Sequence, residues 1–113
     1  MKTLIVIVNW RTADLTIDCL RSLASQVSDP AVDARVIITD NASGDGSIDR
    51  IACAIAANGW KWAETMPLPR NGGFAYGNNA ALRACLPQTG GGSDFVLLLN
   101  PDTIVREGAL REL

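Results

Sequence analysis

The sequence predicts an α/β fold in which helices cover both faces of a parallel sheet. Along its 113 residues, short apolar runs rich in Val, Ile and Leu alternate with segments of helical periodicity. The first runs are continuous rather than alternating, which is typical of strands covered on both faces. Each run ends in polar residues and turn formers. Because parallel strands need crossover connections, this alternation predicts successive β-α units within one domain.

The first unit begins with a strand over Thr3–Val8, a run that is apolar after Thr3 and mostly β-branched. The following stretch, "ADLTIDCLRSLASQ", has the spacing of an amphipathic helix. Thr12 or Asp14 would cap its start. The apolar stripe of this helix consists of Leu15, Cys19 or Leu20, Leu23 and Val27.

The second unit repeats this pattern. A strand is predicted over Ala34–Thr39, and the turn formers "DNASGDGS" end it. A helix follows over Ser47–Asn58, and Gly59 is placed to cap its carboxyl end. The apolar stripe of this helix consists of Ile48, Ile51, Ala52 and Ile55.

The remaining elements are predicted from shorter patterns. In "WKWAETMP", Trp60, Trp62 and Met66 alternate as in a short strand, and "GFAYGNNAALRACL" predicts a helix. Glycines at positions 90–92 break the chain before a fourth strand, "FVLLL", which is predicted to be buried and central. The residues "EGALREL" are expected to open a final helix.

Composition and charge exclude several classes of function. The chain has 48% hydrophobic residues, 19% charged residues and a net charge of −2, so a broad electrostatic attraction to nucleic acid or anionic lipid is not expected. The apolar run near the N-terminus is too short for a membrane span. Cys19, Cys53 and Cys85 are widely spaced, which favours buried thiols over a disulfide or metal site and fits a reducing cytosol.

All four predicted strands end in polar residues. The ends are "NWRT", "DNASGDGS", "PRNGGF" and "NPDT". In parallel α/β sheets, ligands bind outside the carboxyl ends of the strands. We therefore expect these residues to face one crevice. Trp10, at the first of these ends, could contact a base or a sugar.

Two interpretations are open for the polar residues after the second and third strands. Asp40 would accept hydrogen bonds from a nucleobase or a ribose hydroxyl, or would cap the turn that follows it. The glycines in "RNGGFAYGNN" and the helix after them suit a phosphate group, or form only a tight turn. No dinucleotide fingerprint or Walker A loop is present. A response-regulator receiver is also disfavoured, because the first strand ends in Asn9-Trp10 rather than in acidic residues.

The fourth strand delivers Asn100, Pro101 and Asp102 to this crevice. Pro101 cannot join the hydrogen-bond ladder, so Asp102 is held just outside the sheet. Asn100 and Asp102 could hold Mg²⁺ or Mn²⁺, which take few protein carboxylates and complete their shell with diphosphate oxygens and water. The alternative is a capped turn that enters the final helix.

Four motifs together carry a family resemblance. In this order, "VIVNW", "DNASGDGS", "NGGFAYGNN" and "LLLNPDT" resemble the motifs of the inverting family 2 glycosyltransferases, most closely of their rhamnosyltransferase-like branch. The resemblance implies a GT-A fold with a Rossmann-like parallel sheet of strand order 3-2-1-4, of which residues 1–113 form the N-terminal nucleotide-sugar-binding domain. Family members are much longer, and their second half supplies the acceptor site and the catalytic base. The resemblance therefore implies truncation before that half, and we name no catalytic base.

The same resemblance implies a donor site. The groups that would contact the nucleoside or shape the loop beside the nucleotide are the backbone of Val8 and Asn9, the carboxylate of Asp40, and Asn71, Gly73 and Phe74. Asp102 would be the ligand of Mg²⁺ or Mn²⁺, at the position of the family's Asp-x-Asp motif. Asn100 would contact the ribose or the water shell of the metal.

Two functions are compatible with the resemblance. The first is transfer of a sugar, such as rhamnose, from a nucleotide-diphosphate donor to a glycan or lipid-linked acceptor, with inversion. The second is a non-catalytic nucleotide-sugar-binding module. For both we expect a cytoplasmic protein, held at the inner face of the membrane through its acceptor or a partner. The face left uncovered by truncation predicts self-association.

Overall fold

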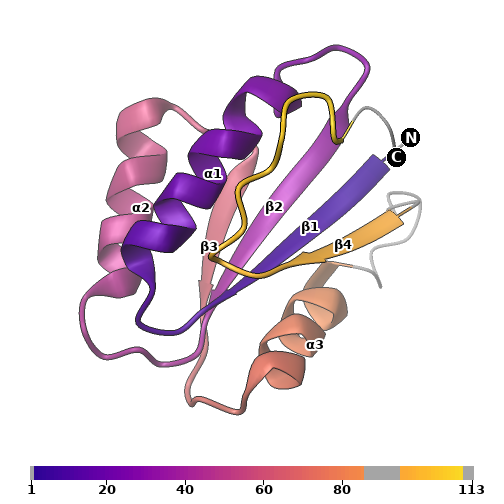
Figure 1. Ribbon diagram of the computed structural model, residues 1–113. Coiled ribbons are helices and arrows are strands. Elements are labelled where there is room, and N and C mark those ends of the chain that lie inside the picture. Colours follow the sequence, from indigo (N-terminus) through magenta and orange to yellow (C-terminus); the bar gives the residue numbers. More distant parts are fainter. Residues whose placement is uncertain (1, 86–94, 111–113) are drawn as a thin grey trace.

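Strands and helices alternate as predicted in the computed structural model, which describes residues 2–85 and 95–110. The glycines predicted to break the chain before the fourth strand lie outside the described residues. Figure 1 shows the elements, whose order confirms the α/β prediction. They are β1 (Lys2–Asn9), α1 (Ala13–Val27), β2 (Asp33–Asp40), α2 (Ser47–Asn58), β3 (Ala63–Pro67), α3 (Phe74–Cys85) and β4 (Phe95–Leu99).

The four strands form one parallel sheet in the order β3-β2-β1-β4, which confirms the expected order. In the central pair, Val8 lies opposite Thr39 and Asn9 lies opposite Asp40. On the other side of β1, Ile7 pairs with Leu99, the last residue of β4. The carboxyl ends of β1 and β2 therefore lie level with each other at one end of the sheet, beside the turn that follows β4.

Successive residues of the central strands pack on opposite faces of the sheet, which explains why these strands are continuously apolar. Ile5 and Ile7 of β1 belong to a core cluster shared with α1 and α2. Leu4 and Val6 belong to a second cluster, shared with Ala81 of α3. In Figure 1, α1 and α2 lie together, and α3 lies apart from them. Both faces of the β1–β2 pair are thus covered by helices.

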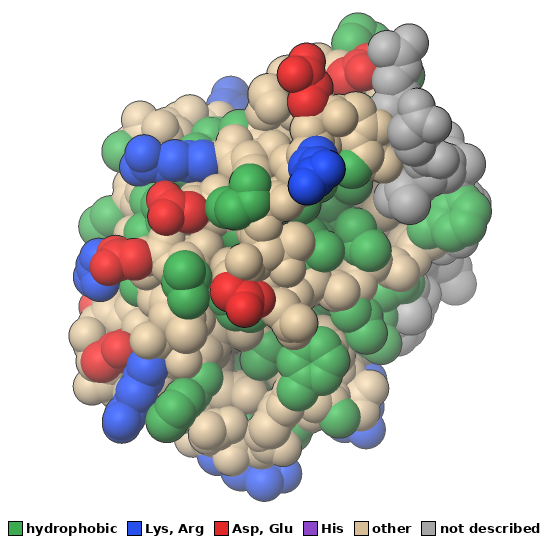
Figure 2. Space-filling view, viewed as in Figure 1, with side chains coloured by type: hydrophobic (Ala, Val, Ile, Leu, Met, Phe, Trp, Pro, Cys, Tyr) green, Lys and Arg blue, Asp and Glu red, His purple; other side chains and the backbone are tan. Residues whose placement is uncertain are grey.

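The prediction that "FVLLL" is a buried central strand is wrong. β4 lies at the edge of the sheet, where β1 is its only strand partner among the described residues. Phe95, Val96 and Leu98 are 48%, 39% and 45% exposed. Figure 2 shows hydrophobic side chains at the surface on this side of the molecule, whereas charged side chains gather over α1 and α2. An apolar run identifies a strand but does not say whether a neighbour covers its outer side.

The chain turns back across α1 after β4, in a stretch that we call the return segment (residues 103–110). The described part of the predicted final helix, from Glu107 to Leu110, forms a turn instead of a helix. Leu110 is 7% exposed and joins the core cluster of α1 and α2. The return segment is thus packed into the fold although it has no regular secondary structure.

Two residues expected on buried helical stripes, Leu15 and Ala52, are exposed, and so is Cys53, which was predicted to be a buried thiol. Leu15 is 47% exposed, because Thr16, one turn before Leu20, takes the sheet-facing position in the first turn of α1. Cys53 is exposed, because Ile51 faces the core and a residue two positions later points away from it. The prediction of buried thiols therefore holds for Cys19 and fails for Cys53, while Cys85 is half-buried.

The ends of the helices and the start of β3 also refine the predictions. Gly59 caps α2 as expected, with a φ of 64° and with the N–H of Trp60 bound to the carbonyl of Ile55 at 3.0 Å. Trp60 and Trp62 precede β3 rather than lying in it, and their ring centroids are 5.7 Å apart. Within the described ranges, none of the helices has the length and hydropathy of a membrane span.

Candidate functional site

The end of β1 is joined to the end of β2 by a buried hydrogen-bond network. Asn9 Nδ2 donates to Asp40 Oδ1 at 2.8 Å, and Ser43 Oγ donates to the same oxygen at 2.6 Å. Asn9 Oδ1 accepts from the hydroxyls of Thr12 and Thr16, both at 2.9 Å. Asn9 is 0% exposed and Asp40 is 3% exposed. Thr12 therefore serves this network, and its side chain does not cap α1.

The loop after β2 is shaped by the same network. Ser43 Oγ accepts from the backbone N–H of Arg11 at 2.8 Å, and the Ser43 carbonyl accepts from Arg11 Nε at 3.0 Å. Arg11 and Ala42 both have a φ of 55°, in the left-handed region that residues other than glycine rarely adopt. Their unusual backbone is held by these contacts, so the loops after β1 and β2 form one rigid unit.

The start of α2 continues this loop. Asp45 accepts hydrogen bonds from the hydroxyl of Ser47 and from its backbone N–H, the latter at 2.9 Å. These bonds, the hydroxyl first, hold the pKa of Asp45 below its ordinary value of 3.8. Asp45 is therefore ionised at neutral pH and ties the loop to the first turn of α2.

Asn41, for which the sequence analysis predicted no role, joins the β2 loop to the start of α3. Its Nδ2 donates to the carbonyl of Gly73 at 2.9 Å, and the N–H of Gly73 donates to Asn71 Oδ1 at 3.1 Å. Gly73 has a φ of 90°, which a side chain would strain. A Cβ on Gly72 would lie 2.4 Å from Cγ of Tyr76. The loop before Phe74, itself 50% exposed, thus depends on both glycines.

Among the residues that the structure describes, three buried polar side chains, one of them in α3 itself, have atoms without a hydrogen-bond partner. They are the hydroxyl of Thr39, Oδ1 of Asn41, and both amide atoms of Asn78, which is 4% exposed. Gly77 lets α3 approach closely, since a Cβ there would lie 2.7 Å from Cγ1 of Val8 and 3.0 Å from Oγ1 of Thr39. Unsatisfied buried groups are unfavourable, so their clustering marks this edge of the sheet as unusual. The helical Gly77 in the third motif was the one feature of the sequence that could have indicated it.

Asp102 lies on the other side of β1 from Asp40. Its turn is closed by a hydrogen bond from the N–H of Thr103 to the carbonyl of Asn100 at 3.1 Å, and the side chains of Asn100 and Asp102 are exposed. Burial raises the pKa of Cys19 to about 11, and the negative charge of Asp102 acts in the same direction. The carboxylate of Asp102 is therefore close enough to α1 to act on a thiol in its core.

The donor atoms at this turn can be compared with the needs of a metal. No group of three or more acidic, His or Cys side chains is placed to hold a metal ion within residues 2–85 and 95–110. One exposed carboxylate with a neighbouring amide fits a hard cation that takes its other ligands from a diphosphate and from water. The two residues thus fit a metal that arrives with its ligand rather than a resident structural ion.

Most of the predicted site residues form one group at the carboxyl ends of β1 and β2, whereas Asn100 and Asp102 lie apart from this group. Asn9, Asp40, Asn71 and Gly73 are connected directly or through Asn41. Asn100 and Asp102 follow β4, which is two strands away from β2. With a spacing of about 4.8 Å between neighbouring strands, β4 and β2 are about 10 Å apart across β1.

Solved structures share this fold. TarS 1–349 of S. aureus in complex with UDP matches with a TM-score of 0.78 and 20% identity, over 99% of this chain and 30% of that chain. The same protein in complex with UDP-GlcNAc matches with a TM-score of 0.75 and 22% identity, over 99% and 30%. The mannosyltransferase PcManGT from Pyrobaculum calidifontis, in complex with GDP-Man and Mn²⁺, matches with a TM-score of 0.74 and 19% identity, over 88% and 27%.

These likenesses show that the sheet and its helices have the fold of the N-terminal nucleotide-sugar-binding part of GT-A glycosyltransferases. The chain spans less than a third of the length of each of these structures. No curated protein matched the sequence. The family model described as glycosyl transferase family 2 matches residues 4–113, which include every strand and helix except the first two residues of β1. The chain therefore belongs to glycosyl transferase family 2.

Proposed function

We propose that this chain is the donor-binding part of a glycosyltransferase that moves a sugar from a nucleotide-diphosphate donor to a glycan or lipid-linked acceptor, with inversion. The observation that carries the proposal is the hydrogen-bonded edge that links Asn9, Asp40 and Ser43 to Gly73 through Asn41. It places polar groups from β1, β2 and α3 side by side where parallel sheets bind ligands.

In this proposal the nucleoside binds at the ends of β1 and β2. The contacts would come from the backbone of Val8 and Asn9 and from the carboxylate of Asp40. That carboxylate already accepts from Asn9 and Ser43, and an ionised carboxylate has acceptor sites for a further donor. The rigid network holds these groups in place before the ligand arrives, which lowers the entropy cost of binding.

The nucleotide is proposed to lie beside the start of α3. Asn71, Gly73 and Phe74 form the loop and the first residue of this helix, and the free N–H groups of a helix start attract phosphate. Oδ1 of Asn41 lies at the same place, because its own Nδ2 is bound to Gly73. This oxygen can accept a hydrogen bond once a ligand or a small movement makes it accessible.

Asp102 is proposed to bind Mg²⁺ or Mn²⁺, with Asn100 in contact with the ribose or with the water shell of the metal. When bound, such a cation offsets the negative charge of the departing nucleoside diphosphate. The structure of PcManGT with GDP-Man and Mn²⁺ supports cation use within this fold. The chain itself would supply one carboxylate on a short turn after β4, and we assign no described residue as the general base.

The finer assignments rest on the motifs. We propose rhamnose as the transferred sugar and polysaccharide biosynthesis as the process, because the four motifs resemble the rhamnosyltransferase-like branch. The acceptor would hold the protein at the inner face of the membrane. We also propose that the exposed apolar side chains of β4 mediate self-association, which light scattering would detect as dimers; a monomer at all concentrations would contradict it.

Calorimetric titration tests the donor site. UDP-, dTDP- and GDP-sugars are titrated into the protein with and without Mn²⁺, and at least one is expected to bind more tightly with the metal. Asp102→Ala should weaken metal-dependent binding about tenfold or more. The matched control is Asp33→Ala, which removes an exposed carboxylate at the opposite end of β2.

The outcomes separate the two halves of the proposal. Absence of binding by every donor would contradict the donor site. Binding that is equally strong without metal, and unchanged in Asp102→Ala, would leave the nucleoside site in place and remove the role of Asp102.

A further inference from the structure

Two polar side chains of α1 bind the return segment. Ser22 Oγ accepts from the N–H of Val105 at 2.9 Å. Gln26 Nε2 donates to the carbonyl of Val105 at 3.2 Å, and Gln26 Oε1 accepts from the N–H of Leu110 at 2.9 Å. These residues are about 80 positions apart in the sequence, as the separations of 83, 79 and 84 show. The contacts are therefore tertiary, and they fix backbone groups rather than side chains.

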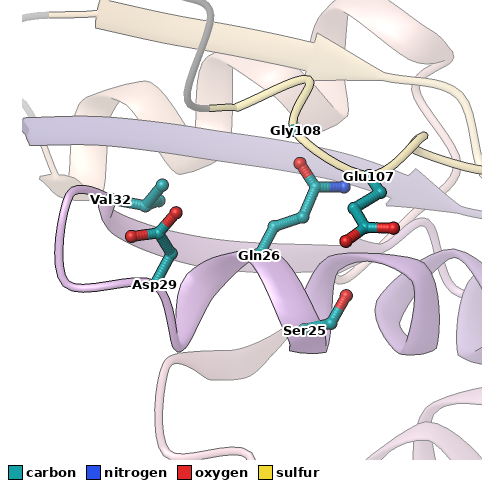
Figure 3. Close-up of a pocket in the computed structure, with 6 residues that line it drawn as sticks. All are labelled: Ser25, Gln26, Asp29, Val32, Glu107 and Gly108. Carbon is teal, nitrogen blue, oxygen red and sulfur yellow. The ribbon is translucent and has the colours of Figure 1, made fainter.

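Gln26 occupies a position that favours an apolar residue. It is 5% exposed and follows Cys19 and Leu23 along the buried stripe of α1. A buried amide is tolerated only when its donors and acceptor are bound. Gln26 reaches this state through Val105 and Leu110, together with a longer bond to the carbonyl of Ser22 at 3.4 Å. Figure 3 shows its amide directed from α1 to the return segment, beside Glu107 and Gly108.

A buried amide of this kind fixes the position of the segment that it binds and also stabilises it. An apolar side chain would pack against the return segment in several registers, whereas two hydrogen bonds to backbone groups of Val105 and Leu110 allow only one. Ser22 adds a second fixed point at Val105, and its own hydroxyl donates to the carbonyl of Cys19 at 2.6 Å. The return segment is thus held at one position along α1.

The position of the return segment along α1 determines where Asp102 lies. On one side of its turn, Leu99 is held by pairing of β4 with β1 at Ile7. On the other side, the first residue bound to another element is Val105, three positions after Asp102. Asp102 itself is exposed, and its position follows from these two anchors. Loss of the second anchor would leave the carboxylate on a chain fixed at one end only.

We propose that Ser22 and Gln26 are positioning residues for Asp102, which hold its carboxylate in place by binding the return segment. The inference rests on the proposed role of Asp102 in metal binding. Residues that orient a metal ligand affect metal affinity when they are changed, typically by about 10- to 100-fold. The nucleoside end of the site lies across β1 and has its own network, so its affinity should not change.

The test uses Mn²⁺ and UDP as probes. Gln26→Met keeps a side chain of similar length but removes its hydrogen bonds, and should weaken Mn²⁺ binding in the presence of UDP about tenfold, measured by electron paramagnetic resonance. The affinity for uridine alone, measured by calorimetry, should stay within about twofold of the wild-type value. A displaced metal ligand lowers the affinity for Mn²⁺ but leaves the nucleoside contacts in place. Ser22→Ala should show a smaller loss of Mn²⁺ affinity, and Ser22→Thr, which keeps the hydroxyl, should restore it.

A merely structural role is excluded by a matched control. Ile51→Val removes a buried methyl group from α2 and lowers the melting temperature, but it leaves the hydrogen bonds of Ser22 and Gln26 to the return segment in place. An equal loss of Mn²⁺ affinity in Ile51→Val, compared at the same margin below the melting temperature, would overturn the proposal. Wild-type affinity in Gln26→Met would overturn it as well.

Hydrogen exchange separates this inference from the proposed function. In the wild type, the amides of Val105 and Leu110 should be protected, and Gln26→Met should remove the protection of Leu110. Unprotected amides in the wild type would overturn the anchoring itself, whether or not Mn²⁺ binds. Protected amides in a protein that binds no Mn²⁺ would instead reject the metal role of Asp102, and the positioning role with it.

Discussion

The two parts of the candidate site, on either side of β1, are built in different ways. On the β1–β2 side, Asn9 and Asp40 are buried and bound to each other and to Ser43. On the β4 side, Asn100 and Asp102 are exposed on an edge strand and a turn. The first side is rigid before any ligand binds, whereas the second depends on distant anchors. The comparison shows that a hydrogen-bonded, buried part and an exposed part lie on opposite sides of β1 within one candidate site.

Removal of the two carboxylates should show the largest difference between the sides. Asp40→Ala would leave Nδ2 of Asn9 and the hydroxyl of Ser43 buried without their acceptor, and should lower the free energy of unfolding by about 3 kcal/mol. Asp102→Ala removes an exposed group and should change it by less than about 0.5 kcal/mol. Urea unfolding measures both values. Similar losses in the two variants would contradict the proposed contrast.

The close contact of α3 with the preformed side can be broken at Gly77. Alanine normally stabilises a helix, but its Cβ here would lie 2.7 Å from Val8, so Gly77→Ala should lower the free energy of unfolding by about 1–3 kcal/mol. In a Val8→Ala background, where the obstructing methyl groups are absent, the same change should cost less. A stabilising effect in the wild-type background would show that α3 does not press on the end of β1.

The smallest expected effect concerns the pKa of Cys19, a thiol in the core on which the charge of the exposed Asp102 acts. The pKa of its thiol is raised from 9.0 to about 11, by burial and then by the charge of Asp102. The folded state therefore holds this proton more tightly than the unfolded state, so the stabilisation is complete below pH 9.0 and is lost as the pH rises toward 11.

Unfolding measured across this alkaline range tests the link. Cys19→Ala should remove part of the fall in stability, and Asp102→Asn should make the fall smaller and end it at a lower pH, because a negative charge no longer opposes the thiolate of the folded protein. Identical pH profiles in the wild type and Asp102→Asn would place Asp102 farther from α1 than the structure has it.

Much of the fold could be predicted because it depends on local patterns. Continuous apolar runs identify the strands, and Gly59 ends α2 through its own left-handed backbone. The exposure of β4 could not be predicted, since an apolar run is the same whether or not a neighbouring strand covers its outer side. Cys53 and Leu15 show a similar limit, because helical periodicity fixes the spacing of a stripe but not which residue faces the sheet.

The site was predicted as a set of positions but not as a set of contacts. Asp40 was expected to bind a ligand or cap a turn, and in the structure its carboxylate binds Asn9 as well as Ser43. Asn41 and Gln26 were given no role, because their importance comes from partners 32 and 84 residues away. Such long-range hydrogen bonds leave no periodic pattern in the sequence. The roles of Val8, Asn9, Asp40, Asn71, Gly73, Phe74 and Asn100 in donor binding and of Asp102 in metal binding stay predictions.

The pairing of Asn9 with Asp40 also has a consequence for folding. The middle parts of β1 and β2, residues 4–8 and 36–38, are apolar on both faces, so hydrophobic contact alone would tolerate a slip of two residues between them. In any slipped alignment the amide and the carboxylate would be buried apart from each other, which is strongly unfavourable. The pair therefore selects the correct alignment of the two central strands during folding, in which Asn9 lies opposite Asp40.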